Sequence, residues 1–172
     1  SNNSLLGASS HSALTGEPGS PPHGSPRLST ETPEHVMGDK HSSPVLAAAT
    51  YGQYLFSADS ASAGNLCVWD LNLWKCVEEY PLIHGGTLAM TIDHERGLLF
   101  SACSDSVIHV WSIKPRSKGH SIALEPAYRL RVPNVGHVLC LGLLHKENEL
   151  LLGSQDSCLR AVTLPVEWEV NE

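Results

Sequence analysis

The feature that most constrains this chain is an internal repeat. A histidine precedes an aspartate by about twenty residues in three places, which begin at His41, His84 and His137. The first two copies continue to a tryptophan, and these residues, Trp69 and Trp111, are 42 positions apart. That period is the length of four short strands with their turns, so each copy is predicted to form one small sheet. Such sheets bury their apolar faces against their neighbours, which predicts a stacked all-β array.

Strand-length apolar runs recur in the same order within the copies. Gly- and Ser-rich turns separate them, and the pattern predicts three four-stranded blades over about 41–82, 83–133 and 134–172. Two longer spacers, 58–65 and 114–125, interrupt this pattern, and we expect both to protrude as surface loops. The predicted strands cover 43–49, 53–57, 65–71, 75–80, 87–92, 98–102, 107–113, 127–132, 138–144, 149–153 and 158–164.

The first 40 residues have a different composition, rich in Ser, Pro, Gly and Thr with isolated aliphatic residues. Such a stretch cannot bury enough apolar surface to offset an ordering entropy of ~1–2 kcal/mol per residue, so residues 1–40 are predicted to be a disordered linker. Four possible phosphorylation sites precede a proline, which holds the residue before it extended, as proline-directed kinases require. The alternative is that Ser and Pro are simply common linker residues that fall side by side. These sites are Ser20, Ser25, Thr32 and Ser43.

The residues His84, Ser101, Asp105 and Trp111, with the Trp-Asp pair that ends at Asp70, resemble the WD40 repeat. The resemblance implies a β-propeller in which the histidine, serine, aspartate and tryptophan of a blade form a structural hydrogen-bond network. Histidine, serine and aspartate are also the residue types of a hydrolytic triad. Ser101, however, lies in the middle of a predicted strand rather than on the exposed, strained turn that a nucleophile needs. We therefore expect no catalytic residues here.

The three copies match the repeat unequally. The second copy is the best match. In the first, Asp59 is displaced by a longer turn, and in the third Val162 stands where Trp111 stands in the second. We therefore expect one well-matched and two degenerate blades. Because a propeller ring has roughly four to eight blades, the remaining blades are expected from the rest of a longer chain or from another subunit.

Charge and cysteine content narrow the possible partners. The chain has 11 Lys and Arg against 18 Asp and Glu, a net charge of −7, which argues against a nucleic-acid partner. No apolar run approaches the ~20 residues that span a bilayer, so no membrane span is expected. The five cysteines form no C-x-x-C pair, which is typical of reduced, buried thiols in an intracellular protein. Their spacing predicts neither a zinc site nor another cofactor.

The repeat predicts a non-catalytic scaffold for protein or peptide partners, located in the cytoplasm. Loops at the ends of blades can vary in binding chemistry while the strands keep the frame rigid. Trp74 and Trp168 fall outside the tryptophan position of the repeat, and both are possible partner contacts because tryptophan is frequent at interface hot spots. The alternative is the substrate receptor or targeting region of a ubiquitin ligase, or of another enzyme, whose catalytic domain lies outside this chain.

Overall fold

The computed structural model describes residues 31–38, 40–82, 85–116, 121–133 and 135–165. The chain divides into two units, Ser1–Glu34 and His35–Glu172. Residues 31–34 of the first unit are exposed and form no strand or helix. The rest of that unit lies outside the described residues, and with it most of the predicted disordered linker.

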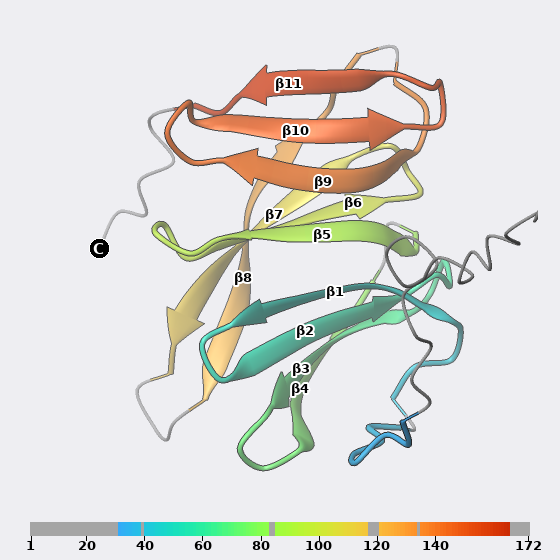
Figure 1. Ribbon diagram of the computed structural model, residues 1–172, viewed down its shortest axis with the longest axis vertical. Coiled ribbons are helices and arrows are strands. Elements are labelled where there is room, and N and C mark those ends of the chain that lie inside the picture. The colour runs from blue at the N-terminus through green and yellow to red at the C-terminus, as the bar shows by residue number, and fades with distance from the viewer. Residues whose placement is uncertain (1–30, 39, 83–84, 117–120, 134, 166–172) are drawn as a thin grey trace, which may run out of the picture. The chain divides into compact units, whose positions relative to one another are not determined.

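Eleven strands in the described part of the second unit form three antiparallel sheets, and neighbours in each sheet are consecutive in the chain (Figure 1). The first sheet contains β1 (Val45–Tyr51), β2 (Tyr54–Asp59), β3 (Asn65–Asp70) and β4 (Lys75–Pro81). The second contains β5 (Thr87–Asp93), β6 (Leu98–Cys103), β7 (Ile108–Pro115) and β8 (Ile122–Leu130). The third contains β9 (Val138–Leu144), β10 (Glu149–Ser154) and β11 (Leu159–Thr163).

The third sheet has three described strands, which match the three strand-length runs of the third copy, whereas a four-stranded blade was predicted there. A fourth strand would follow β11, and residues 166–172 lie outside the described part of the chain. The first two sheets have the predicted four strands each.

The spacer 114–125 is not the protruding loop that its position between predicted strands suggested. β7 and β8 stay paired through Lys114↔Ala123 and Pro115↔Ile122, so residues at both ends of the spacer belong to the two strands of a long hairpin. The reason is burial: Ile122 and Leu124 belong to the apolar core between the first and second sheets. That core favours the extended backbone over a solvated loop.

In the second sheet, alternate residues of a strand face the two neighbouring sheets. In the second sheet, Leu99 packs into a core shared with the first sheet, and Phe100 packs into a core shared with the third. Successive strand residues point to opposite faces, so one sheet can be apolar on both sides. β1, β5 and β9 are neighbours in space, which places the first strand of each sheet at one edge of the stack.

Candidate functional site

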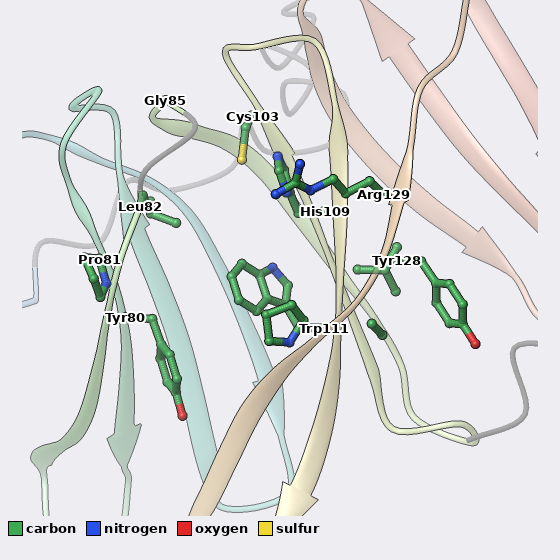
Figure 2. Close-up of a pocket in the computed structure, with 12 residues that line it drawn as sticks. Tyr80, Pro81, Leu82, Gly85, Cys103, His109, Trp111, Tyr128 and Arg129 are labelled. Carbon is green, nitrogen blue, oxygen red and sulfur yellow. The ribbon is translucent and has the colours of Figure 1, made fainter. Parts of the chain in front are cut away.

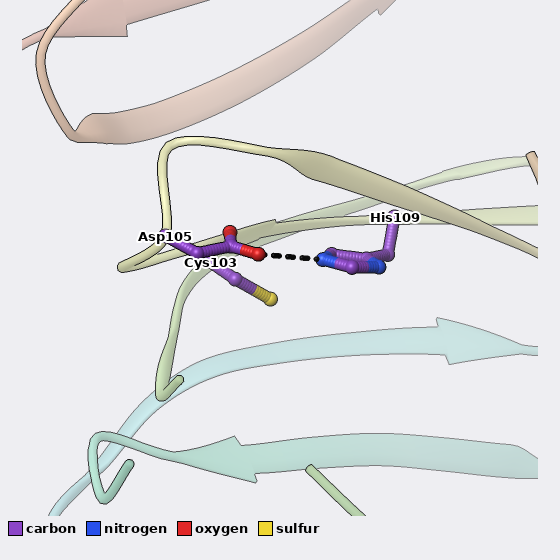
Figure 3. A group of neighbouring side chains, drawn as sticks. All are labelled: Cys103, Asp105 and His109. Atoms are coloured by element: carbon purple, nitrogen blue, oxygen red, sulfur yellow. Dashed lines mark hydrogen bonds and ion pairs between the residues drawn. The ribbon is translucent and has the colours of Figure 1, made fainter. Parts of the chain in front are cut away.

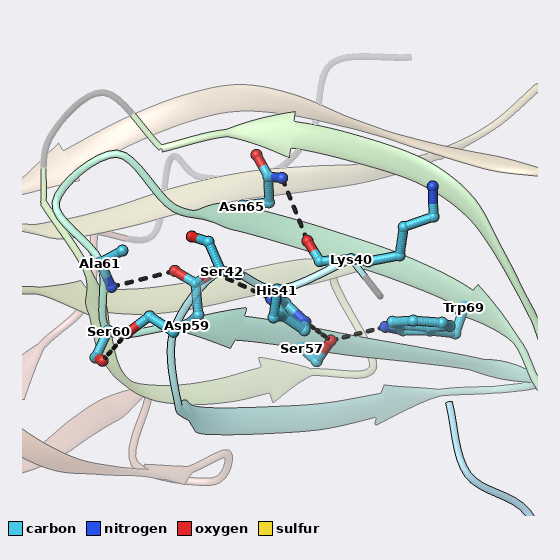
Figure 4. A network of polar contacts seen from close by, with 10 residues as sticks. Lys40, His41, Ser42, Ser57, Asp59, Ser60, Ala61, Asn65 and Trp69 are labelled. Carbon is cyan, nitrogen blue, oxygen red and sulfur yellow. Dashed lines mark hydrogen bonds and ion pairs between the residues drawn. The ribbon is translucent and has the colours of Figure 1, made fainter. Parts of the chain in front are cut away.

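The first sheet carries a hydrogen-bond network that ties the segment before β1 to the sheet (Figure 4). The Ser57 hydroxyl accepts the Trp69 indole N–H at 2.7 Å and lies 2.7 Å from Nε2 of His41. Nδ1 of His41 lies 3.4 Å from the buried Asp59 carboxylate. Nε2 of His41 is hydrogen-bonded to the Ser57 hydroxyl, whereas Nδ1 is buried near Asp59 without a hydrogen-bond partner. Asp59 also accepts the backbone N–H groups of Ser42 and Ala61, each at 3.2 Å.

The sequence of the first unit was expected to be degenerate, with Asp59 displaced by its longer turn. The longer turn after β2 does not displace Asp59 out of reach, because the carboxylate lies at the end of the strand and binds the backbone of that turn. In the structure, the histidine, serine, tryptophan and aspartate side chains all meet in this sheet.

In the second sheet, the structure brings together only some of the predicted network residues. The Trp111 indole N–H donates to the Ser101 hydroxyl at 3.0 Å, and this hydroxyl donates to the backbone carbonyl of His109 at 3.3 Å. Asp105 lies 3.2 Å from Nε2 of His109, four residues along the same hairpin. His84, the predicted partner of Asp105, lies outside the described residues. His109 was not anticipated, although an aspartate four residues before a basic residue recurs in the third copy as Asp156 and Arg160.

Cys103 completes a cluster of three potential metal ligands with Asp105 and His109 (Figure 3). Their ligand atoms all lie within 4.8 Å of one another at the β6–β7 hairpin. The Cys103 sulfur is 3.7 Å from the Thr87 hydroxyl, and burial raises the pKa of its thiol. The sequence predicted no metal site from the spacing of the cysteines, whereas this set joins one cysteine to an aspartate and a histidine.

Next to this cluster is a cavity with a volume of about 650 Å³ (Figure 2). It is bounded by β4 and the residues after it in the first sheet, and by β7 and β8 of the second. The Tyr80 and Trp111 rings are 6.4 Å apart, centroid to centroid. The lining is mostly apolar and includes Tyr80, Leu82, Cys103, His109, Trp111 and Tyr128. The cluster residues Cys103 and His109 therefore face this space.

The third sheet has an ion pair at the positions that correspond to the cluster of Cys103, Asp105 and His109. Arg160 donates from Nη2 to Asp156 at 2.6 Å and from Nη1 to the Ser154 hydroxyl at 3.1 Å. The Ser154 hydroxyl is also hydrogen-bonded to Asp156. Hydrogen bonds from Arg160 and Ser154 hold the pKa of Asp156 well below its usual range. Val162 lies opposite Leu150, as Trp111 lies opposite Leu99, so this sheet has no indole at that position.

Trp74 lies at the tight β3–β4 turn with its backbone in the left-handed region, at φ 52°. Asp70 closes this turn by accepting the N–H groups of Asn72 and Leu73, as Asp93 accepts those of Glu95 and Arg96 in the β5–β6 turn. In the β5–β6 turn, Gly97 occupies the corresponding left-handed position. Trp74 is therefore a bulky residue at a position where the backbone conformation favours glycine. Trp74 is 44% exposed, Leu73 is 61% exposed, and the His35 ring stacks on Trp74 at 3.9 Å.

The other residues singled out from sequence are distributed as follows. Thr32 is exposed. The Ser43 hydroxyl is hydrogen-bonded to that of Ser60 at 2.6 Å, so a kinase would have to break this contact. Ser20, Ser25 and Trp168 lie outside the described residues.

The third sheet exposes an apolar face at positions that are buried in the other two sheets. Leu159 is 85% exposed, whereas Ile108 and Leu66, which hold its place in β7 and β3, are 1% and 0% exposed. We call this the open face; it consists of Cys140, Gly142, Leu151, Gly153, Leu159 and Ala161. A Cβ built on Gly153 would meet the Cys140 sulfur and the Leu159 side chain, which places all three on one side of the sheet.

Comparison with solved structures identifies the architecture. A chain in the crystal structure of a mitotic checkpoint complex superposes with a TM-score of 0.59 at 16% sequence identity, over 72% of this chain and 37% of that chain. The fold is WD40-like. At this identity the similarity concerns the fold alone, and this chain spans little more than a third of the other. No family model and no curated protein matches the sequence.

Over the ranges that the structure describes, no helix has the length and apolar character that a span requires.

Proposed function

We propose that this chain is a non-catalytic protein-interaction scaffold, a segment of a WD40 propeller whose open face packs against a further blade. The observation that carries the proposal is the exposure of Leu159. The same position is buried in both preceding sheets, where the next sheet covers it. Full burial of a leucine side chain stabilises by ~1.5–3 kcal/mol, so the open face is a strong site for association.

The occupant that fits the open face is another β-sheet with an apolar side. In the first sheet, Phe56 and Val68 are covered by residues of β5, β6, β7 and β8. In the second, Phe100 and Val110 are covered by residues of β9, β10 and β11. The open face continues this series with Leu151 and Ala161 at the matching positions. The second sheet covers the apolar face of the first, and the third sheet covers that of the second. A further blade of the same type would cover the open face of the third sheet in the same way.

The exposed turn at Leu73 and Trp74 supports a second contact, with a protein or peptide partner. An aromatic residue in the left-handed region costs backbone strain, and such strain is commonly retained where a side chain has a function. The five cysteines are all free, which is typical of a reducing compartment, so we place the scaffold in the cytoplasm.

Sedimentation of the full chain tests this proposal. In a solution of this chain alone, only other copies can supply a sheet to cover the open face, so we expect self-association. Leu159→Glu should shift the distribution towards monomer, because it places a charge in the centre of the contact. The matched control is Val36→Glu, which adds the same charge at another exposed aliphatic residue and should leave the association unchanged. A monodisperse wild-type monomer with a sharp thermal transition would overturn the proposal, and so would an equal effect of the two variants.

A further inference from the structure

We propose that Cys103, Asp105 and His109 form a zinc-binding site with one coordination position open to the neighbouring cavity. The three side chains come from one tight hairpin and present a sulfur, a carboxylate oxygen and an imidazole nitrogen to a common point (Figure 3). This inference does not depend on the open face of the third sheet and goes beyond the scaffold role.

The donor set and its spacing suit Zn²⁺. Thiolate, imidazole and carboxylate are the ligands that this ion takes in proteins, whereas Mg²⁺ and Ca²⁺ prefer oxygen alone. Zinc–ligand distances of ~2.0–2.3 Å place tetrahedral donors about 3.3–3.8 Å apart. The Asp105 oxygen and the His109 nitrogen are 3.2 Å apart, close to that separation without any ion. The Cys103 sulfur lies within 4.8 Å of both atoms, so an inward movement of about 1 Å completes the set.

The third sheet has an arginine in place of one of the three potential ligands, and its positive charge neutralises the equivalent aspartate. Ser154 stands at the end of β10 as Cys103 stands at the end of β6, and Arg160 follows Asp156 by four residues as His109 follows Asp105. There the guanidinium bridges the carboxylate and the serine hydroxyl. In the second sheet both flanking residues are instead metal ligands around the same aspartate. The zinc ion would thus take the place of the arginine charge.

The surroundings provide an outer partner and an open position. The Thr87 hydroxyl is 3.7 Å from the Cys103 sulfur and can donate a hydrogen bond to the thiolate. Cys103 and His109 line the cavity of about 650 Å³, so the fourth position faces that space and would be filled by water. On binding, the Cys103 thiol loses its proton to the buffer and becomes the thiolate ligand, so metal uptake releases protons.

Cobalt titration of the full chain tests the site, since Co²⁺ occupies zinc sites and reports on its ligands. We expect one Co²⁺ per chain, with a sulfur-to-cobalt charge-transfer band and visible bands typical of a tetrahedral ion, displaced by Zn²⁺. The test variant is Cys103→Ser with His109→Arg, which copies the Ser154 and Arg160 set of the third sheet and therefore preserves a hairpin already used by this fold. It should lose the bands and weaken binding by more than the roughly 10–100-fold that loss of an outer partner costs.

The control is Cys158→Ser, which removes an exposed thiol elsewhere and should keep the bands and the stoichiometry. Circular dichroism in the presence of a chelator should show the same strand content for wild type and both variants. The proposal is overturned if the wild-type chain gives no thiolate band, or if the band survives in the double variant. Loss of the band in Cys158→Ser would likewise overturn it, because the thiolate would then belong to another site.

Discussion

Residues at equivalent positions on one face of the second and third sheets are buried in the second sheet and exposed to solvent in the third. Ile108 and Leu159 stand at equivalent places in β7 and β11, yet the first is buried under the third sheet and the second is among the most exposed leucines described. Their strands pair with the same register along β6 and β10. The comparison teaches that pairing within a sheet is a local property of each repeat, whereas burial of its outer face depends on a neighbour. On the scaffold proposal, a partner sheet would cover the open face of the third sheet.

Truncation of the equivalent apolar residues should give the largest difference between the two sheets. Ile108→Ala removes a buried side chain and leaves a cavity, so it should lower the free energy of unfolding by about 2–5 kcal/mol. Leu159→Ala removes an exposed side chain and should change it by no more than about 0.5 kcal/mol under conditions where the chain is monomeric. Urea denaturation followed by circular dichroism measures both values. Similar losses for the two variants would show that the open face is already covered within one chain.

The hydroxyl–indole pair of the second sheet should make a smaller, specific contribution. Ser101→Ala leaves the Trp111 N–H without its acceptor, which should cost about 1–3 kcal/mol. The third sheet has Leu152 and Val162 at the two matching positions and needs no such bond. Combining Ser101→Ala with Trp111→Phe should therefore cost less than the sum of the single changes. Strict additivity in a double-mutant cycle would argue that the two side chains do not depend on each other.

The ion pair of the third sheet should give the smallest effect, visible mainly through its dependence on pH. Arg160 lowers the pKa of Asp156 in the folded state, so the ionised carboxylate stabilises the fold above its unfolded pKa of about 4. This contribution is lost as the pH falls through the folded pKa. Arg160→Gln should therefore lower the melting temperature at pH 7, and its difference from wild type should shrink below about pH 4. A difference that is constant from neutral to acid pH would assign the effect to packing instead.

Much of the fold followed from the sequence, because period and alternation report directly on strands. Ten of the eleven strands begin and end within two residues of their predicted bounds, and the exception, β8, begins five residues earlier than expected. It does so because Ile122 and Leu124 gain burial against the first sheet, a tertiary effect that the local pattern does not contain. Asp70 and Asp93 each bind the backbone of their own tight turn, a feature that the sequence analysis did not use.

The polar sites were harder to predict, because they depend on which side chains meet across a hairpin. Alignment of the copies assigned the best network to the second unit and missed that Asp59 reaches His41 despite the longer turn. It paired Asp105 with His84 and did not consider His109, which lies on the same face of the hairpin. The cluster of potential ligands was not apparent for the same reason: Cys103 has no cysteine partner in sequence, and only the register of β6 and β7 places its sulfur beside Asp105 and His109.

Alkylation of Cys140 tests the central claim most directly, because this thiol lies on the open face beside Leu159. Cys158 is an exposed reference, and Cys67 is an unreactive one, since burial and the nearby Cys76 raise the pKa of its thiol to about 12. We predict that Cys140 reacts as fast as Cys158 in dilute solution and in Leu159→Glu, and becomes protected as the wild-type chain associates, while Cys158 stays reactive. Mass spectrometry of the alkylated peptides measures each rate. A Cys140 rate that does not change with protein concentration, in a sample that does associate, would contradict the claim that the open face is the docking surface.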